Sequence, residues 1–161
     1  MTMKFSSNQF EKIKNEATDF YNKLEKVKCP YFPNDQIFFN RKGLDHLKFK
    51  AWNRSRLPED QFMRFKLLKY APEVIRKSHT LQEICERKNP ERIKINSRWE
   101  KRVKKVSYYG FVAIIDEIRT KVIIKEISGG EKYFWSIIPC WKQSKSIINK
   151  KILHIGNLEE D

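Results

Sequence analysis

The chain has 161 residues, with 34 Lys and Arg against 20 Asp and Glu, so its formal charge is +14 and its pI is near 9.7. Such an excess of positive charge predicts a polyanionic partner. A chain of this length forms about one domain, and its 40% apolar content excludes intrinsic disorder for most of it. No stretch is as apolar as a membrane span, and the first residues lack the apolar run of a secretory signal, so we expect no membrane association and a cytoplasmic location.

Cysteine, histidine and glycine usage argues against metal or cofactor chemistry. The three cysteines are far apart and odd in number, which predicts reduced packing residues, and the three histidines lack the close spacing of a metal site. These residues are Cys29, Cys85 and Cys140, and His46, His79 and His154. Five glycines without a phosphate-binding loop disfavour a nucleotide cofactor, so we expect neither a metal nor a cofactor.

The beginning of the chain predicts a long helix, a short strand and a brief second helix. Apolar residues at intervals of three and four predict a helix over residues 8–27, with a capping box formed by Asn8 and Glu11. Residues 36–40 predict a strand. A turn then leads into a brief helix that carries His46, which places this histidine just past a strand end.

The middle of the chain predicts more helices, and its last third predicts strands. A helical region starts at Pro58 and is interrupted at residues 71–72, and two short helices are expected over residues 73–77 and 81–87. From Tyr108 the hydrophobic period changes to two, which is typical of an antiparallel meander. Its expected strands cover residues 108–116, 120–127 and 132–138.

A dense basic segment lies between the helices and the meander. Residues 87–106 carry nine basic residues against two acidic ones. We expect this segment to bind nucleic acid, because clustered cations contact phosphates. The basic residues are Arg87, Lys88, Arg92, Lys94, Arg98, Lys101, Arg102, Lys104 and Lys105.

The meander predicts one apolar face and one basic face. The glycine pair at 129–130 suits a two-residue turn, which pairs Lys125 with Phe134, and a two-residue turn at residues 117–118 pairs Ile115 with Thr120. Residues paired across a ladder share a face. The expected core face holds Phe111, Ala113, Ile115, Val122, Ile124, Tyr133, Trp135 and Ile137. The opposite face holds Tyr108, Arg119, Lys121, Lys125, Lys132, Phe134 and Ser136. Lysines on such a face can simply be solvated, but Tyr108 and Phe134 among them favour a nucleic-acid surface with base stacking.

Three motifs stand out along the chain. They are Ile37-Phe-Phe-Asn-Arg-Lys-Gly-Leu-Asp-His46-Leu, Arg64-Phe-Lys-Leu-Leu-Lys-Tyr-Ala-Pro-Glu-Val-Ile75, and Lys121-Val-Ile-Ile-Lys-Glu-Ile127 with Gly129-Gly130 and Phe134-Trp-Ser136-Ile. Together they resemble the phage-associated nucleases of the barnase, EndoU, colicin and RelE-like superfamily, over about residues 37–142.

The resemblance implies an α+β fold in which N-terminal helices pack on one face of an antiparallel sheet of about four strands. Because no linker is long enough to divide the chain, we expect a single domain over residues 1–161, with an N-terminal helix in 1–30, a nuclease-like core in 36–142 and a C-terminal tail in 143–161. The resemblance also implies a free-standing, metal-independent ribonuclease toxin. Its partners would then be RNA and an acidic antitoxin or immunity protein.

The residues themselves offer the chemistry of such a nuclease. Attack of a 2′-OH on its own phosphate needs a base, an acid and cations where negative charge develops. His46 is a natural proton carrier with an ordinary pKa near 6.5, although a structural role is equally open. The expected catalytic set is His46, Arg119, Lys121, Lys125 and Ser136.

Two other functions are compatible with the sequence. The chain can be a non-catalytic nucleic-acid-binding protein, in which residues 87–105 track phosphates and the short helices in 58–87 resemble a helix-turn-helix. It can also be an interaction module whose positive face docks an acidic protein. Cleavage of RNA in the presence of a chelator distinguishes the ribonuclease from these two alternatives.

Overall fold

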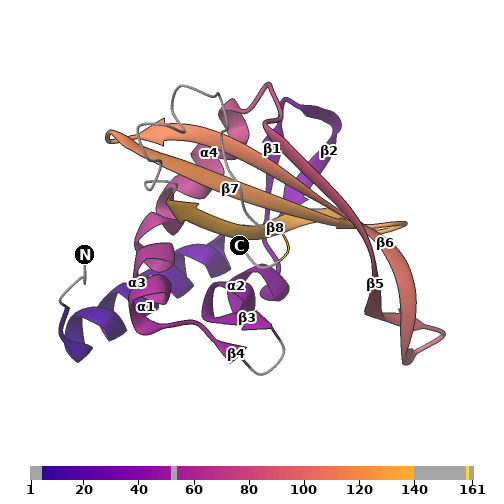
Figure 1. Ribbon diagram of the computed structural model, residues 1–161, viewed down its shortest axis with the longest axis horizontal. Helices are drawn as coiled ribbons and strands as arrows, with labels where there is room; N and C mark the ends of the chain where they lie inside the picture. The colour runs from indigo at the N-terminus through magenta and orange to yellow at the C-terminus, as the bar shows by residue number, and fades with distance from the viewer. Residues whose placement is uncertain (1–4, 52–53, 140–158, 160–161) are drawn as a thin grey trace, which may run out of the picture.

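The computed structural model describes residues 5–51, 54–139 and 159 and has an α+β fold, with the helices in the N-terminal half and a mostly antiparallel sheet (Figure 1). The helices are α1 (Ser7–Lys23), α2 (Arg41–Lys48), α3 (Pro58–Leu67), the short 3₁₀ turn η1 (Leu68–Tyr70) and α4 (Ala71–Lys77). The strands are β1 (Lys26–Cys29), β2 (Phe32–Phe38), β3 (Phe49–Ala51), β4 (Arg54–Ser55), β5 (Glu83–Ile95), β6 (Arg98–Ile115), β7 (Ile118–Ile127) and β8 (Lys132–Pro139). Among the described residues, none of the helices is long and apolar enough to cross a membrane.

The main sheet has six strands, in the order β1-β2-β8-β7-β6-β5, and is therefore larger than the expected four. All neighbours are antiparallel except β2 and β8. The two extra strands are β1, expected as the end of the first helix, and β5, which begins where a helix over residues 81–87 was expected. The helix expectation for residues 81–87 is wrong because β5 pairs with β6 along its whole length, and cross-strand pairing overrides the local capping pattern.

The helices pack on one face of this sheet. Phe111, Val122, Ile124 and Ile137 are fully buried there beneath residues of α1 to α4, which confirms these parts of the expected core face. The β6–β7 turn lies at residues 116–117 rather than 117–118. This moves the register by two residues, so each side chain keeps its face.

Because of a bulge in β8, the expected facing of Tyr133, Phe134 and Trp135 is wrong. Ile123 pairs with Ser136 as expected, but Ile124 pairs with Phe134, so Trp135 is an extra residue in β8. Phe134 therefore points into the core, where its ring stacks on Phe39 at 5.2 Å. Tyr133 and Trp135 lie with the apolar cluster of the opposite face, against expectation.

Two local features place α2 beside this bulge. Asn40 caps α2 by accepting a hydrogen bond from the Gly43 amide at 3.2 Å, and the Tyr21 hydroxyl donates to the Asn40 carbonyl. Gly43 lies so close to Phe134 that a Cβ atom there would overlap the Phe134 carbonyl oxygen. His46 thus lies on a short helix just past β2, as expected, and its helix is held against β8.

Several expectations concern other parts of the chain. The first helix begins with a capping box of Ser6 and Gln9, not of Asn8 and Glu11, and it ends at Lys23. Cys29 is buried and Cys85 is half-buried, and both are free thiols. Cys140, His154 and the tail expected in 143–161, apart from Glu159, lie outside the described residues.

Candidate active site

A chain of hydrogen bonds links α2 to β8 through two buried arginines. Arg56 donates from Nε to the His46 carbonyl at 2.8 Å, and its Nη2 lies 2.9 Å from His46 Nε2. Asp60 lies between the arginines, with Arg56 Nη1 at 3.5 Å and Arg64 Nε at 2.7 Å. Arg64 Nη1 then donates to the Ser136 hydroxyl at 2.5 Å. His46, Arg56, Arg64 and Ser136 are all buried.

The start of α3 explains this arrangement. Pro58 is the first residue of α3, so Asp60 and Arg64 are separated by one turn and share a helix face. Asp60 can therefore hold Arg64 from one side while it receives Arg56 from the segment before the helix. The carboxylate fixes both guanidinium groups in place.

Lys125 and Trp135 join the same cluster from the sheet. The His46 ring stacks on Trp135 with centroids 3.9 Å apart and planes 20° apart. Lys125 Nζ lies 4.2 Å from the Trp135 ring centre and 3.1 Å from Glu91 Oε1. The bulge in β8 is what brings Trp135 to this side of the sheet.

The surroundings determine the charge state of His46. Burial, followed by the charges of Arg56, Arg64 and Lys125, lowers the pKa of His46 from 6.5 to about 2. Arginine has donors only, so Nε2 of His46 must accept from Arg56, and the ring proton lies on Nδ1. The expectation of an ordinary histidine pKa is therefore wrong, and His46 is a neutral hydrogen-bond donor near pH 7.

The pKa of Lys125 is also shifted. Burial lowers the pKa of Lys125, and the Glu91 carboxylate opposes this effect only in part. An amine in this environment releases its proton more readily than an exposed lysine does. Lys125 is thus a cation that can also donate a proton.

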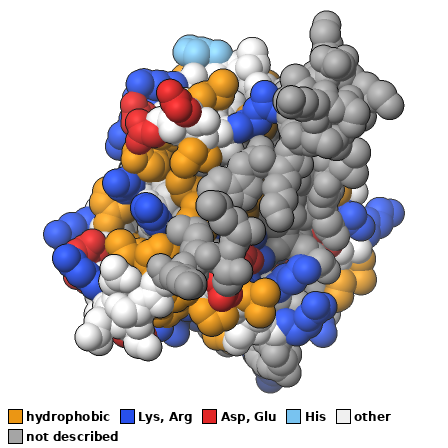
Figure 2. Space-filling model, turned by 60° about the vertical axis from the view of Figure 1, so that its left-hand side comes forward, with side chains coloured by type: hydrophobic (Ala, Val, Ile, Leu, Met, Phe, Trp, Pro, Cys, Tyr) orange, Lys and Arg blue, Asp and Glu red, His pale blue; other side chains and the backbone are white. Residues whose placement is uncertain are grey.

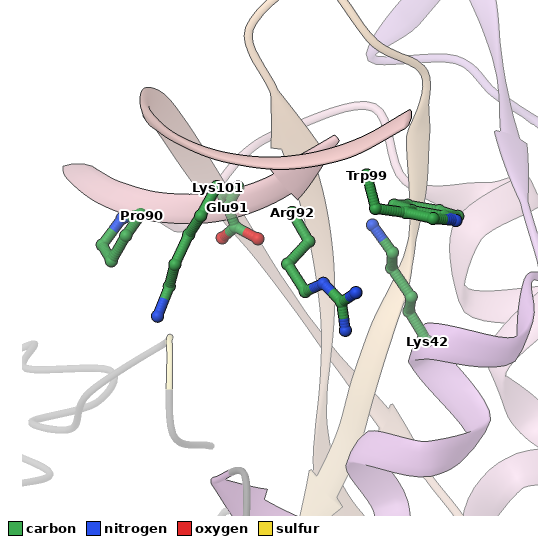
Figure 3. A pocket seen from close by; sticks show the side chains of 6 residues that line it. All are labelled: Lys42, Pro90, Glu91, Arg92, Trp99 and Lys101. Atoms are coloured by element: carbon green, nitrogen blue, oxygen red, sulfur yellow. The ribbon is translucent and has the colours of Figure 1, made fainter. Parts of the chain in front are cut away.

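His46 and Lys125 line a groove of about 700 Å³ at the surface, together with Trp135, Lys42 and Glu91. A second hollow of about 990 Å³ adjoins the first, since Lys42 and Glu91 line both, and we call the two hollows together the groove between α2 and the β5–β6 hairpin. Its lining side chains are shown in Figure 3: Lys42, Pro90, Glu91, Arg92, Trp99 and Lys101.

The other two members of the expected catalytic set lie elsewhere. Arg119 and Lys121 are on β7 with Lys125, six and four residues away, which is about 20 and 13 Å along a strand. Lys121 is completely buried, and its Nζ lies 3.5 Å from Glu83 Oε2. The expectation that the three cations of β7 converge on an open face is therefore wrong.

Among the residues expected to bind nucleic acid, those of the basic segment lie at the surface and the two aromatic residues do not. Eight of its nine cations are exposed and Lys104 is half-buried, on the long β5–β6 hairpin. Phe134 is in the core and Tyr108 is almost fully buried, so neither offers an open ring for stacking. Figure 2 shows Lys and Arg side chains spread over the visible face among hydrophobic ones, without a single large patch.

The sequence analysis missed both arginines of the cluster, and it also missed Asp60 and Glu91 beside them. Arg64 has a detectable signal, since Asp60 precedes it by four residues on a helix. Arg56 has none, because it lies in a connecting segment and meets His46 only in the folded chain.

No family model matches the chain, and no curated protein and no solved structure matches it.

Proposed function

We propose that the protein is a metal-independent endoribonuclease with a fold of the barnase, EndoU, colicin and RelE-like type. The observation that carries the proposal is the cluster itself. Arg56, Arg64 and Lys125 place three cations around His46, and two of these four side chains, His46 and Lys125, line the groove. Cations and neutral donors held rigidly in a poorly hydrated site are what a phosphorane transition state requires.

The proposed reaction is attack of a ribose 2′-OH on the adjacent phosphorus. The new bond joins the 2′-oxygen to phosphorus and the bond from phosphorus to the 5′-oxygen breaks, leaving a 2′,3′-cyclic phosphate and a free 5′-OH. The ion pair between Glu91 and Lys125 opens around the phosphate, so that Glu91 accepts the proton of the 2′-OH on one side of phosphorus and Lys125 donates a proton to the departing 5′-oxygen on the other. His46 donates from Nδ1 to a non-bridging oxygen.

The arginines support these groups without lining the groove. Arg56 is a positioning residue, because its bond to Nε2 keeps the His46 proton on Nδ1. Arg64 holds Ser136 on β8 and adds positive charge near the reacting phosphate. These two arginines thus supply the positive charge that was expected from Arg119.

The test is cleavage of a fluorescent RNA in EDTA, with product ends analysed for cyclic phosphate. Lys125→Gln and Glu91→Gln should each lower the rate by roughly 10² to 10³, the usual effect of losing one acid, base or charge-stabilising group. Arg119→Gln is the matched control, since it removes a cation from the same strand outside the cluster, and it should keep its rate. Full activity of Lys125→Gln, or cleavage that needs a metal, would refute the proposal.

A second candidate is non-catalytic RNA binding, favoured by the exposure of the basic hairpin. Charge on a projecting surface supports affinity without any reacting group. Tight binding of intact RNA by wild-type protein, with no product after prolonged incubation, would establish this function in place of the first.

A further inference from the structure

The outer part of the β5–β6 hairpin is a two-stranded arm, defined by residues 88–105. In the described chain β6 pairs with β7 only from Val106 onward, so residues 88–95 and 98–105 pair with each other alone. Asn96 and Ser97 form its turn with φ of 48° and 66°. Eight residue pairs make the arm about 27 Å long, and Figure 1 shows it extending away from the sheet past α2.

The arm bends back toward the body of the protein. Across the sheet, Lys125 pairs with Tyr108 of β6, and Tyr108 pairs with Cys85 of β5. Glu91 is six residues further along β5 than Cys85, yet its Oε1 lies 3.1 Å from Lys125 Nζ. The groove beside the active site therefore has α2 on one side and the arm on the other. In Figure 3, Lys42 of α2 extends toward Trp99 of the arm, and Arg92 lies between Lys42 on one side and Glu91 and Lys101 on the other.

The arm carries like charges directly opposite each other. Arg92 pairs with Lys101, and Lys88 pairs with Lys105 four residues away on the same face, where Lys105 also forms an ion pair with Glu86 at 3.3 Å. Such pairs destabilise a ladder. In the described part of the chain, no carboxylate forms an ion pair with Lys42, Arg92 or Lys101 in the groove. A bound phosphate between them would turn the repulsion into attraction.

Two large aromatic side chains are exposed along the same groove. Trp99 is 60% exposed, and the Arg92 guanidinium lies 5.8 Å from its ring centre. Phe49 is 44% exposed and lines the groove near His46. Exposed rings beside cations are typical of surfaces on which unpaired bases stack.

We propose that this groove binds a single-stranded segment of RNA next to the cleaved bond. Lys42, Arg92 and Lys101 contact its phosphates, and Trp99 and Phe49 stack on its bases. A duplex does not fit this role, since its bases are already stacked on each other and cannot lie on Trp99. The proposal rests on the proposed function for the position of the cleaved bond, but binding in the groove can be measured without cleavage.

The experiment uses a labelled 2′-O-methyl oligonucleotide, which lacks the attacking hydroxyl and stays intact. Its binding is followed by anisotropy at several salt concentrations, as a single strand and as a duplex. Arg92→Gln with Lys101→Gln should reduce the slope of log affinity against log salt by about 1.4, at about 0.7 for each phosphate contact. Lys88→Gln with Lys105→Gln is the matched control, because it removes the same charge from the same face of the arm outside the residues that line the groove.

Trp99 provides the second measurement. Trp99→Ala should weaken single-strand binding at least about fivefold, the lower end of one base–aromatic stack, and Trp99→Phe should retain most of it. Equal losses in the two double variants would show diffuse attraction and overturn the proposal, and so would equal affinity for duplex and single strand. If the single strand binds as expected but natural RNA is never cleaved, the groove assignment stands and the ribonuclease proposal fails.

Discussion

His46 should make the stability of this protein depend on pH. The residue is 5% exposed, and its pKa falls from 6.5 to about 2 on folding. Between these two values the unfolded chain binds a proton at this position and the folded chain does not. Stability is therefore fully present above pH 6.5 and is lost as the pH falls below it, by about 1.4 kcal/mol for each pH unit.

The contribution of His46 to the pH dependence of stability can be isolated by comparing wild-type protein with His46→Gln. Glutamine cannot be protonated, but its side-chain oxygen can still accept from Arg56. The loss of stacking on Trp135 costs the same at every pH, whereas the titration of the carboxylates cancels between the two proteins. From pH 7.5 to 4.5, wild-type protein should lose about 2.7 kcal/mol more than His46→Gln, or roughly 5–10 °C in Tm.

Urea unfolding at pH 7.5, 6.5, 5.5 and 4.5 measures this difference directly. The free energies of the two proteins should converge as the pH falls, with the steepest change below pH 6.5. Parallel curves over the whole range would show that His46 titrates alike in both states. The assignment of a neutral, Arg56-bound imidazole would then be incorrect.

Three further predictions concern the fold around the site. Phe134→Ala should lower the free energy of unfolding by about 3–5 kcal/mol in urea titrations, because it opens a cavity in the core. Lys121→Met should cost about 3–5 kcal/mol by leaving the half-buried Glu83 carboxylate beside an apolar chain, and adding Glu83→Gln should recover part of that loss in the same titration. Gly43→Ala should cost about 1–3 kcal/mol in thermal melts, since its Cβ has no room against the Phe134 backbone.

Local periodicity was enough to predict much of the sheet. The apolar alternation from Phe111 to Ile137 placed Phe111, Val122, Ile124 and Ile137 on the buried face, where they lie. That prediction was correct although the β6–β7 register differs by two residues, because an even shift preserves the facing of every side chain. The exposure of residues 87–105 was also predictable, since so dense a group of cations cannot be buried.

The bulge and the cluster could not be predicted in this way. Tyr133, Phe134 and Trp135 are three consecutive aromatic residues, so periodicity does not show which of them faces the core. In the folded chain Phe134 packs against Phe39 and α2, and Trp135 is the extra residue of the bulge. Strand β5 could not be predicted either, because a two-stranded arm has no buried face and therefore no hydrophobic period.

The sequence by itself determined the helix-then-sheet order, the apolar face and the basic surface, because each depends on residues close together in the chain. Only the tertiary structure decided which polar side chains meet. Arg64 and Ser136 are 72 residues apart in sequence and share a hydrogen bond, whereas Lys121 and Lys125 are neighbours in sequence and lie in different surroundings. Burial among Arg56, Arg64 and Lys125 then changed His46 from an ordinary titrating group into a neutral donor, a property that no local pattern encodes.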